Sequence, residues 1–167
     1  RGFRDPLLSD RYYRGPTGGG LVTGNPDLVP ETSLQWDLAL RWSRGGVRMD
    51  GYAFHYRIRD LIERYREGDD FFFRNRGEAE LDGIEVEGAV DLGGGLELRA
   101  GVWWLEGEVR DDGTPLDDVP GPGASLTLAG AVSSRWWWSV RGAGSLRDDR
   151  PGPTEREVPG YVIVDAV

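Results

Sequence analysis

Two carboxylates, Glu85 and Glu87, come nearest to a catalytic pair in this sequence. They lie two positions apart, so on a strand both would project from one face about 6.5 to 7 Å apart, which is a separation seen in inverting glycosidases. Any two carboxylates at this spacing on a strand would do the same. Arg99, expected close to them across a hairpin, would give an ordinary ion pair. We therefore predict no catalytic residues and no enzyme activity.

Metal and cofactor chemistry find little support in the sequence. His55 is the only histidine and there is no cysteine, so a transition-metal site is not expected and His55 is interpreted as a polar wall residue. The glycine runs at 18–20 and 93–95 are not phosphate loops, because no lysine follows them. Four Asp-Asp pairs could bind surface cations, but solvated turn acids explain them better. No metal and no cofactor are predicted.

A cluster of cationic and aromatic residues near the N-terminus is the best candidate for ligand binding. Arginine pairs with carboxylates and catecholates, and tyrosine stacks on planar groups. The cluster precedes the first predicted strand, and its alternative interpretation is a loop packed on the rim of the fold. The candidate ligand-binding residues are Arg4, Arg11, Tyr12, Tyr13 and Arg14.

Apolar residues alternate with polar ones along seven segments, which predicts strands with one apolar face. The clearest segment, 34–42, has Leu or Trp at every even position and polar residues or alanine between them. The other predicted strands cover residues 52–58, 84–90, 96–104, 126–132, 136–140 and 161–167.

Short and long connections alternate between these segments. Three-residue turns at 44–46, 93–95 and 133–135 would keep the apolar faces together, and they predict the pairs Trp42 with Arg48, Val90 with Leu98, and Gly130 with Trp138. The connections at 63–70, 111–121 and 148–159 are long and rich in Asp, Gly and Pro. Short turns at one end and long loops at the other are typical of outer-membrane barrels.

The direction of the apolar faces separates two classes of protein. In a membrane barrel Leu38, Phe54, Val86 and Leu128 would point to lipid, whereas in a soluble all-β domain they would form a core. Two bands of aromatic residues, Trp42 and Trp136 near the short turns and Trp104 with Tyr56 near the loops, favour the barrel. The polar face predicted to line the interior contains Gln35, Asp37, Arg41, His55, Arg57, Glu85, Glu87, Arg99 and Arg141.

Composition excludes other classes. The 167 residues include 26 Gly and seven Trp, which fits neither a helical bundle nor a disordered tail. The net charge of -9 is opposite to that of a nucleic-acid binder. No apolar run is long enough for a membrane helix, and the first residue is not methionine. We expect the chain to be one domain and a segment of a longer protein.

Several motifs resemble TonB-dependent outer-membrane receptors. Gly2-Phe3-Arg4-Asp5-Pro6 is similar to their GFRAP stretch, and residues 24–33, Gly-Asn-Pro-Asp-Leu-Val-Pro-Glu-Thr-Ser, are similar to their GNPDLKPETS block. Residues 58–62, 75–87 and 158–165 resemble later segments of the same barrels. The resemblance implies an incomplete all-β antiparallel transmembrane barrel over 1–167, an open arc of about seven strands without plug and last strands. Residues 1–32 would form an extracellular loop region and residues 33–167 the strands.

The same resemblance implies a function. A receptor of this family lies in the outer membrane of a Gram-negative bacterium, among lipid and lipopolysaccharide, and takes up a scarce nutrient, most often a ferric siderophore. TonB would act through the missing plug, and no nucleic acid is involved. A soluble all-β ligand-binding or structural domain remains the alternative.

Overall fold

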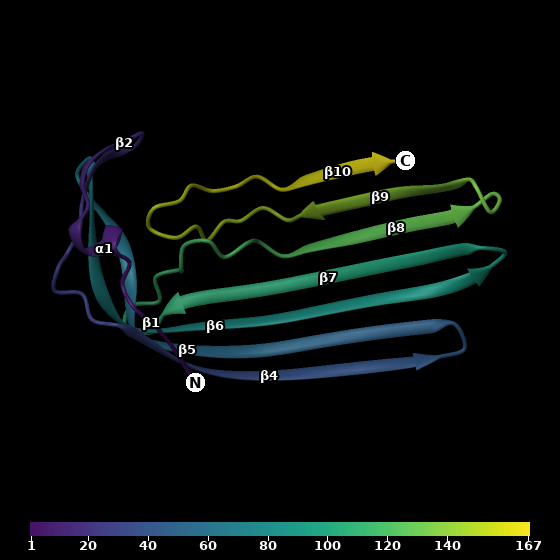
Figure 1. Cartoon of the computed structure of the whole chain (residues 1–167), viewed down its shortest axis with the longest axis horizontal. Coiled ribbons are helices and arrows are strands. Elements are labelled where there is room, and N and C mark those ends of the chain that lie inside the picture. Colours follow the sequence, from purple (N-terminus) through teal and green to yellow (C-terminus); the bar gives the residue numbers. More distant parts are fainter.

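The computed structural model describes residues 1–167 as one mainly antiparallel sheet, curved and open, with a small cap at one end (Figure 1). Seven strands meander through it in sequence order, which confirms the all-β, open-arc prediction. They are β4 (Glu31–Arg44), β5 (Val47–Glu67), β6 (Asp70–Gly93), β7 (Leu96–Val109), β8 (Gly123–Ala131), β9 (Trp137–Ser145) and β10 (Tyr161–Ala166).

The N-terminal segment forms the cap and adds three short strands. Strand β1 (Gly2–Arg4) pairs antiparallel with the start of β4. It is followed by helix α1 (Leu8–Tyr12) and the hairpin of β2 (Arg14–Thr17) and β3 (Gly20–Thr23), and β3 then runs parallel to the start of β6. None of the helical structure has the length and apolarity needed to cross a bilayer.

The turn between β4 and β5 is shorter than predicted. Arg44 pairs with Val47, so the turn has only two residues, Gly45 and Gly46, with φ of 57° and 81°. Positive φ at both positions is the geometry of a type I′ turn, which suits glycine. The pair of Trp42 with Arg48 is therefore wrong, because Trp42 pairs with Met49. The other two predicted pairs, Val90 with Leu98 and Gly130 with Trp138, are confirmed.

This turn exchanges the two faces of β5 relative to the prediction. Directly paired residues on neighbouring strands share a face, and Phe54 pairs with Asp37 and Gly83, whereas Ala53 pairs with Leu38 and Ile84. Phe54 and its neighbours on the same face, Tyr52, Tyr56 and Ile58, thus lie on the polar face of the sheet. His55 and Arg57, predicted for that polar face, lie on the opposite one. Both face assignments were wrong for the same reason. Shortening the turn from three residues to two shifts the β4–β5 register by one residue, and a shift of one residue moves every side chain of β5 to the opposite face.

The other face carries an exposed apolar band, as a membrane barrel requires, and no dry core forms around it. Leu38 is 71 % exposed and Leu126 is 54 % exposed, instead of converging in a dry core. Trp36 and Trp104 border this band toward the long loops, and Trp42 and Trp138 border it toward the short turns. Trp36 and Trp42 are six residues apart on β4, about 20 Å at the usual strand rise, which suits two interfacial belts of a membrane barrel. Tyr56 does not belong to the upper belt, because it lies on the polar face.

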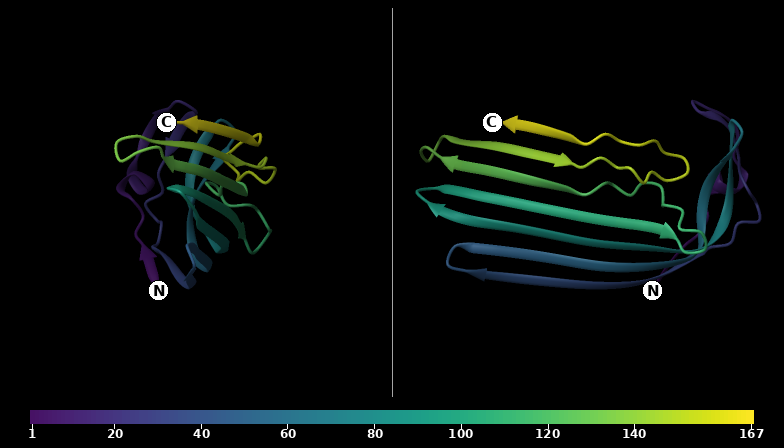
Figure 2. Two further views of the ribbon diagram at one scale, coloured as in Figure 1. Left: turned by 90° about the vertical axis from the view of Figure 1, so that its right-hand side faces the viewer. Right: turned by 180° about the vertical axis from the view of Figure 1, so that it is seen from behind.

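Strands β5 and β6 extend far beyond the rest of the sheet. The predicted loop at 63–70 is wrong, because pairing continues to Glu67 and Asp70 around a two-residue turn. The ladder is interrupted at Asp60, which has a φ of 56°, and the side-chain amide of Asn75 donates to the Asp60 carbonyl oxygen over 2.7 Å. Beyond this kink the hairpin turns out of line with the strands and runs across the loop end (Figures 1 and 2).

The sheet does not close on itself. Most of β4 lacks a partner on one side, and β10 has one neighbour, β9. Unpaired backbone groups cannot face hydrocarbon, so further strands must cover both edges in the membrane. The structure therefore describes part of a barrel wall.

Candidate functional site

Four segments that are distant in sequence surround one cavity at the loop end. They are the N-terminal segment, the kinked β5–β6 hairpin, the β7–β8 connection and the β9–β10 connection. The cavity has a volume of about 600 Å³. It is lined by Arg4, Asp10, Leu61, Ile62, Glu63, Arg64, Phe73, Leu116, Asp117, Asp118, Thr154 and Glu155. A mixture of charged and apolar groups around such a space suits a small polar ligand with an apolar part.

Arg4 lines this cavity but is held by the fold. Its guanidinium binds both oxygens of Glu31, over 2.8 and 3.0 Å, and a second contact reaches the Ile62 carbonyl oxygen over 3.3 Å. Glu31 also accepts the backbone N–H of Ile62 over 3.0 Å. The hydrogen bond to Glu31 is the main cause that raises the pKa of Arg4. The Arg4–Glu31 pair thus fastens β1 and β4 to the hairpin beside its kink.

The other four predicted ligand residues do not converge with Arg4. Arg11 donates to the Leu28 carbonyl oxygen over 2.7 Å, and its Nε is enclosed without a hydrogen-bond partner. The Tyr13 hydroxyl donates to the Pro16 carbonyl oxygen over 3.1 Å. Tyr12 and Arg14 are exposed. The cluster expected from adjacency in sequence is therefore dispersed, and its role in binding stays a prediction.

A buried carboxylate stiffens the kinked hairpin beside the cavity. Glu63 is 8 % exposed, and it accepts Arg74 Nε over 2.8 Å and Arg76 Nη1 over 2.6 Å. Arg76 also contacts Asp112 of the β7–β8 connection. Sequence reasoning missed this network because Glu63 and Asp112 lie in the predicted loops 63–70 and 111–121, and neither Arg74 nor Arg76 lies in a predicted strand.

Acid is expected to loosen the β7–β8 connection at Asp112. Hydrogen bonds from the Thr114 hydroxyl and backbone N–H, with Arg76 as a smaller cause, lower the pKa of Asp112 from its ordinary 3.8. A lowered folded-state pKa means that the stabilising contribution is complete above 3.8 and is lost as pH falls through the lower value. Hydrogen exchange at the Thr114 amide in the full-length protein, corrected for intrinsic exchange, should rise in that acidic range. Asp112→Ala removes the acceptor and should show the fast exchange at every pH, and a pH-dependent rise in that variant would contradict the assignment.

A clasp of hydrogen bonds joins the β7–β8 and β9–β10 connections on the opposite side of the cavity. Asp117 accepts the backbone N–H of Thr154 over 3.0 Å and its hydroxyl over 2.8 Å. Glu155 accepts the backbone N–H of Asp118 over 3.0 Å. These contacts, which we call the Asp117–Thr154 clasp, hold two otherwise irregular loops against each other.

Removing the clasp should free both loops without affecting the wall. Asp117→Ala deletes two hydrogen bonds, each worth about 0.5 to 1.5 kcal/mol, so we expect limited proteolysis within 146–160 to accelerate about tenfold. Asp111→Ala, six residues earlier in the same β7–β8 connection and outside the clasp, is the matched control. Equal cleavage rates in the two variants would show that the clasp does not restrain the loop.

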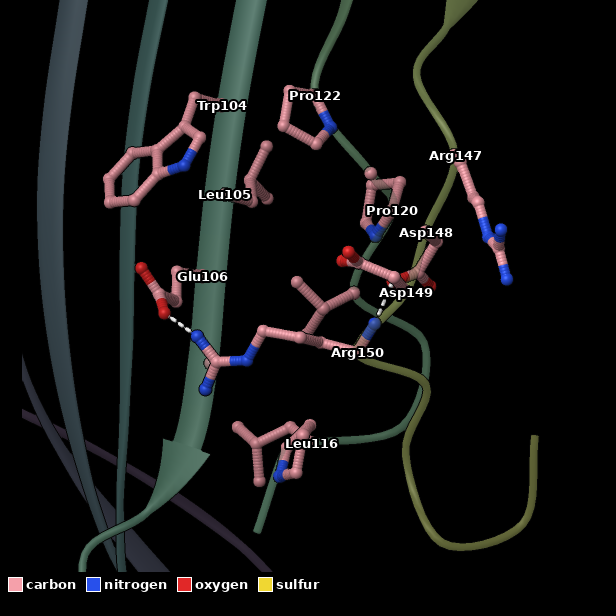
Figure 3. Close-up of a pocket in the computed structure, with 14 residues that line it drawn as sticks. Trp104, Leu105, Glu106, Leu116, Pro120, Pro122, Arg147, Asp148, Asp149 and Arg150 are labelled. Carbon is pink, nitrogen blue, oxygen red and sulfur yellow. Dashed lines mark hydrogen bonds and ion pairs between the residues drawn. The ribbon is translucent and has the colours of Figure 1, made fainter. Parts of the chain in front are cut away.

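The wall itself has an opening beside β7. Beyond the Trp103–Gly123 pair, β7 has no β8 partner in the ladder. Arg150 of the β9–β10 connection reaches across to Glu106 (Figure 3). It also contacts Glu108 over 3.2 Å. A hollow of about 280 Å³ lies between these groups. Glu106 and Glu108 share the face of Trp104, so this contact lies on the apolar side of the sheet, directly above the aromatic belt.

The polar face carries charged groups and flat-lying rings. Arg41 binds Asp50 over 2.6 Å, and Arg48 binds Glu97 over 3.0 Å. Arg99 also pairs with Glu97, not with Glu85 or Glu87 as predicted.

Two rings of the polar face rest on glycines of the neighbouring strands. The Phe54 ring covers the position where Gly83 would carry a Cβ, and the Trp103 ring does the same at Gly123. Trp103 Nε1 also donates to the Gly121 carbonyl oxygen over 3.2 Å.

His55 lies on the apolar side of the sheet, above the band, with its Nδ1 2.8 Å from Asp82 Oδ1. No group of three or more His, Asp or Glu side chains is arranged to hold a metal ion.

Comparison with known proteins agrees with this geometry. The family model described as "TonB dependent receptor-like, beta-barrel" matches residues 1–167. The iron-regulated outer membrane virulence protein of Vibrio cholerae serotype O1 is 27 % identical, over 98 % of this chain and 29 % of that protein. The vitamin B12 transporter BtuB of Vibrio vulnificus is 29 % identical over 66 % of this chain and 17 % of that protein. The chain thus spans under a third of these relatives.

Solved structures show the same fold. The copper transporter OprC superposes with a TM-score of 0.84 at 20 % identity, covering 98 % of this chain and 27 % of that one. The ferric yersiniabactin uptake receptor FyuA of Yersinia pestis superposes with a TM-score of 0.67 at 18 % identity, covering 83 % of this chain and 22 % of that one.

Proposed function

Because the chain belongs to the TonB-dependent receptor β-barrel family, we propose that the full-length protein imports a scarce nutrient through the outer membrane, in which it lies. This segment supplies part of the wall, whose apolar band faces lipid and whose polar face lines the lumen. Residues 1–32 act as an extracellular loop region, and residues 33–167 form the strands. Import needs no bond chemistry in this segment, and we propose that it is not enzymatic.

The observation that carries the proposal is the cavity formed by four extracellular segments. A receptor must first capture its ligand from outside, and this cavity opens where the Arg4–Glu31 pair and the Asp117–Thr154 clasp hold those segments together. Tyr12 and Arg14 are exposed on the same N-terminal segment and are available to contact a ligand at the rim. Arg11 and Tyr13, which bind backbone oxygens, would position that segment.

The ligand we propose is an iron complex, most specifically a ferric siderophore. A relative named for iron regulation and a structural neighbour named for ferric yersiniabactin uptake support this choice. The names of other similar proteins point to copper and to vitamin B12, which makes them the competitors to test. Energy would come from TonB through a plug domain, and the outer surface of the wall would contact lipid and lipopolysaccharide.

Uptake by the full-length receptor tests the proposal. Cells that carry it as their only such receptor are given ferric hydroxamate and ferric catecholate complexes labelled with radioactive iron, and in parallel cyanocobalamin and copper(II). We expect accumulation of at least one ferric complex that disappears when TonB is deleted. Uptake of cyanocobalamin or copper(II) without any ferric complex would overturn the iron assignment, and uptake that persists without TonB would overturn the receptor assignment.

Variants then locate the binding surface. Tyr12→Ala combined with Arg14→Ala should weaken binding of the transported complex, measured by Trp quenching on the purified receptor. Arg135→Ala, in a short turn at the opposite end of the strands, is the control. Equal binding in both variants would exclude the N-terminal segment from the ligand surface.

A further inference from the structure

One side chain, Asn75 of β6, joins the kink of the β5–β6 hairpin to the N-terminal segment. Its amide nitrogen donates to the carbonyl oxygens of Asp60, over 2.7 Å, and of Val29, over 2.9 Å. Its Oδ1 accepts the backbone N–H of Val29 over 2.8 Å. We call these three hydrogen bonds the Asn75 bracket, because they use both ends of the amide and connect segments that are distant in sequence.

The backbone at the kink needs such support. Asp60 has a φ of 56°, which lies in the left-handed region where a Cβ crowds the backbone. The regular ladder also stops here, because Asp60 has no partner on β6 although both its neighbours are paired. The bracket supplies hydrogen bonds at the point where strand pairing gives none. It therefore stabilises a bend that the two strands alone would not keep.

The bend turns one face of the hairpin toward the cavity at the loop end. Ile62 and Arg64 lie on this face, since they are two residues apart on β5, and Phe73 shares it because it pairs directly with Arg64. All three line the cavity of about 600 Å³. Beyond the kink the hairpin runs across the loop end (Figure 2). A hairpin that continued straight along the strands would carry Arg64 and Phe73 away from the opposite wall of the cavity, where the clasp lies.

Arg64 and Phe73 are suited to contact a ligand. The Arg64 side chain makes no hydrogen bond or ion pair within the chain, and its guanidinium lies over the Phe71 ring, 5.1 Å from the ring centroid. Stacking of this kind fixes an arginine but leaves the N–H groups at the guanidinium edge free to donate. The other arginine of the cavity, Arg4, is already bound to Glu31. The hairpin thus offers free hydrogen-bond donors and an apolar surface side by side.

We propose that Asn75 is a positioning residue for capture of the transported nutrient. The bracket keeps the hairpin bent, so that Arg64 and Phe73 face the cavity before the nutrient arrives. Arg64 then donates to oxygen atoms of the iron complex, and Phe73 packs against its apolar part. Asn75 does not line the cavity, so its effect on binding passes through the direction of the hairpin. This inference rests on the proposed role of the cavity in nutrient capture, but the bend itself needs no ligand.

The separation between the hairpin tip and the far end of the wall tests the bend. Nitroxide labels are placed at Asp69→Cys, in the tip, and at Arg135→Cys, in a short turn at the opposite end of the strands, on the full-length receptor without other cysteines. Pulsed electron paramagnetic resonance should give one narrow distance distribution. Asn75→Ala should broaden it and shift it to longer distances. Asp60→Val should do the same, because a β-branched residue opposes a positive φ.

Gln35→Ala is the matched control. Gln35 also donates two hydrogen bonds through its side-chain amide, to Asp37 and Tyr56, but it does not line the cavity and has no bond to the kink. The distance distribution should therefore stay narrow in this variant.

Ligand binding connects the bend to capture. The probe is the compound that uptake identifies among ferric hydroxamate, ferric catecholate, cyanocobalamin and copper(II), and its binding is measured by Trp quenching. If the bent hairpin falls to about a tenth of the population, Asn75→Ala should weaken binding about tenfold, with unchanged heat-dependent gel mobility. Adding Asp60→Gly should restore part of the affinity, since glycine adopts a positive φ without a Cβ clash. A loss of stability alone would not be repaired in this way.

Each outcome judges the positioning role. An unchanged distance distribution in Asn75→Ala, or a changed distribution with unchanged affinity, would overturn it. Equal effects of Asn75→Ala and Gln35→Ala would do so too. Failure of the import proposal is distinguishable, because it would leave no accumulated compound while the distance still shifts in Asn75→Ala.

Discussion

A single alanine inserted between Gly45 and Gly46 should abolish assembly of the full-length receptor in the outer membrane. The two-residue turn sets the parity of β5, with Ala53 on the lipid face and Phe54 on the lumen face. A third turn residue reverses that parity, so Asp50 and Arg48 would turn toward hydrocarbon while the rings of Tyr52 and Phe54 would leave the lumen wall. We expect at least a tenfold loss of heat-modifiable receptor in membranes, because the insertion exchanges the lipid face and the lumen face of β5 along its whole length.

The matched control is the same insertion between Gly68 and Asp69. This turn also has two residues, but it lies at the tip of the kinked hairpin, outside the membrane, where neither face meets lipid. Surface tips of this kind tolerate insertions. Normal amounts of receptor with the Gly45–Gly46 insertion would show that the faces of β5 do not depend on this turn.

Arginine substitutions on neighbouring residues should reveal the two faces of the wall directly. Leu38→Arg and Ala53→Arg place a charge in the lipid-facing band and should lower the free energy of unfolding by about 2 to 4 kcal/mol. Ala39→Arg and Tyr52→Arg project into the lumen and should cost no more than about 1 kcal/mol. Denaturant titration of the receptor in lipid vesicles measures the four values.

The two variants on β5, Ala53→Arg and Tyr52→Arg, distinguish the structure from the sequence-based prediction. Alternation alone placed Tyr52 toward lipid, so it predicts a larger loss of unfolding free energy for Tyr52→Arg than for Ala53→Arg. A larger loss at Tyr52 than at Ala53 would therefore contradict the register of the β4–β5 hairpin.

The strands themselves were predictable because most of them alternate strongly. Leu34 to Trp42 and Leu96 to Trp104 each have one apolar side, and the pairs of Val90 with Leu98 and Gly130 with Trp138 follow from it. Strand β5 was ambiguous because both its faces suit a sheet: Tyr, Phe and Ile alternate with His, Arg and small residues. Amphipathic tyrosines can line a lumen as well as a membrane interface. Only the length of the preceding turn therefore decides which face of β5 meets lipid. Gly45-Gly46 suits a two-residue turn, and the alternation pattern does not show this.

The loop end was less predictable, since its contacts join segments far apart in sequence. Residues 63–70 are polar and contain Gly68, which indicates a loop, yet the ladder continues because Arg74 and Arg76 neutralise Glu63 across the hairpin. The partners of Arg4, Glu31 and Ile62, could not be inferred from the N-terminal motif alone. Adjacency in sequence suggested one ligand cluster, whereas the cavity draws single residues from four segments.

The Phe54 and Trp103 rings, which rest on glycines, also affect the width of the lumen in the complete barrel. With Gly83 and Gly123 beneath them, Phe54 and Trp103 occupy space that wall side chains would otherwise fill, so their bulk does not narrow the conduit. A valine at either glycine would lift the aromatic plane inward and obstruct whatever moves past it. The width of the lumen at these positions therefore depends on Gly83 and Gly123 more than on the aromatic rings that cover them.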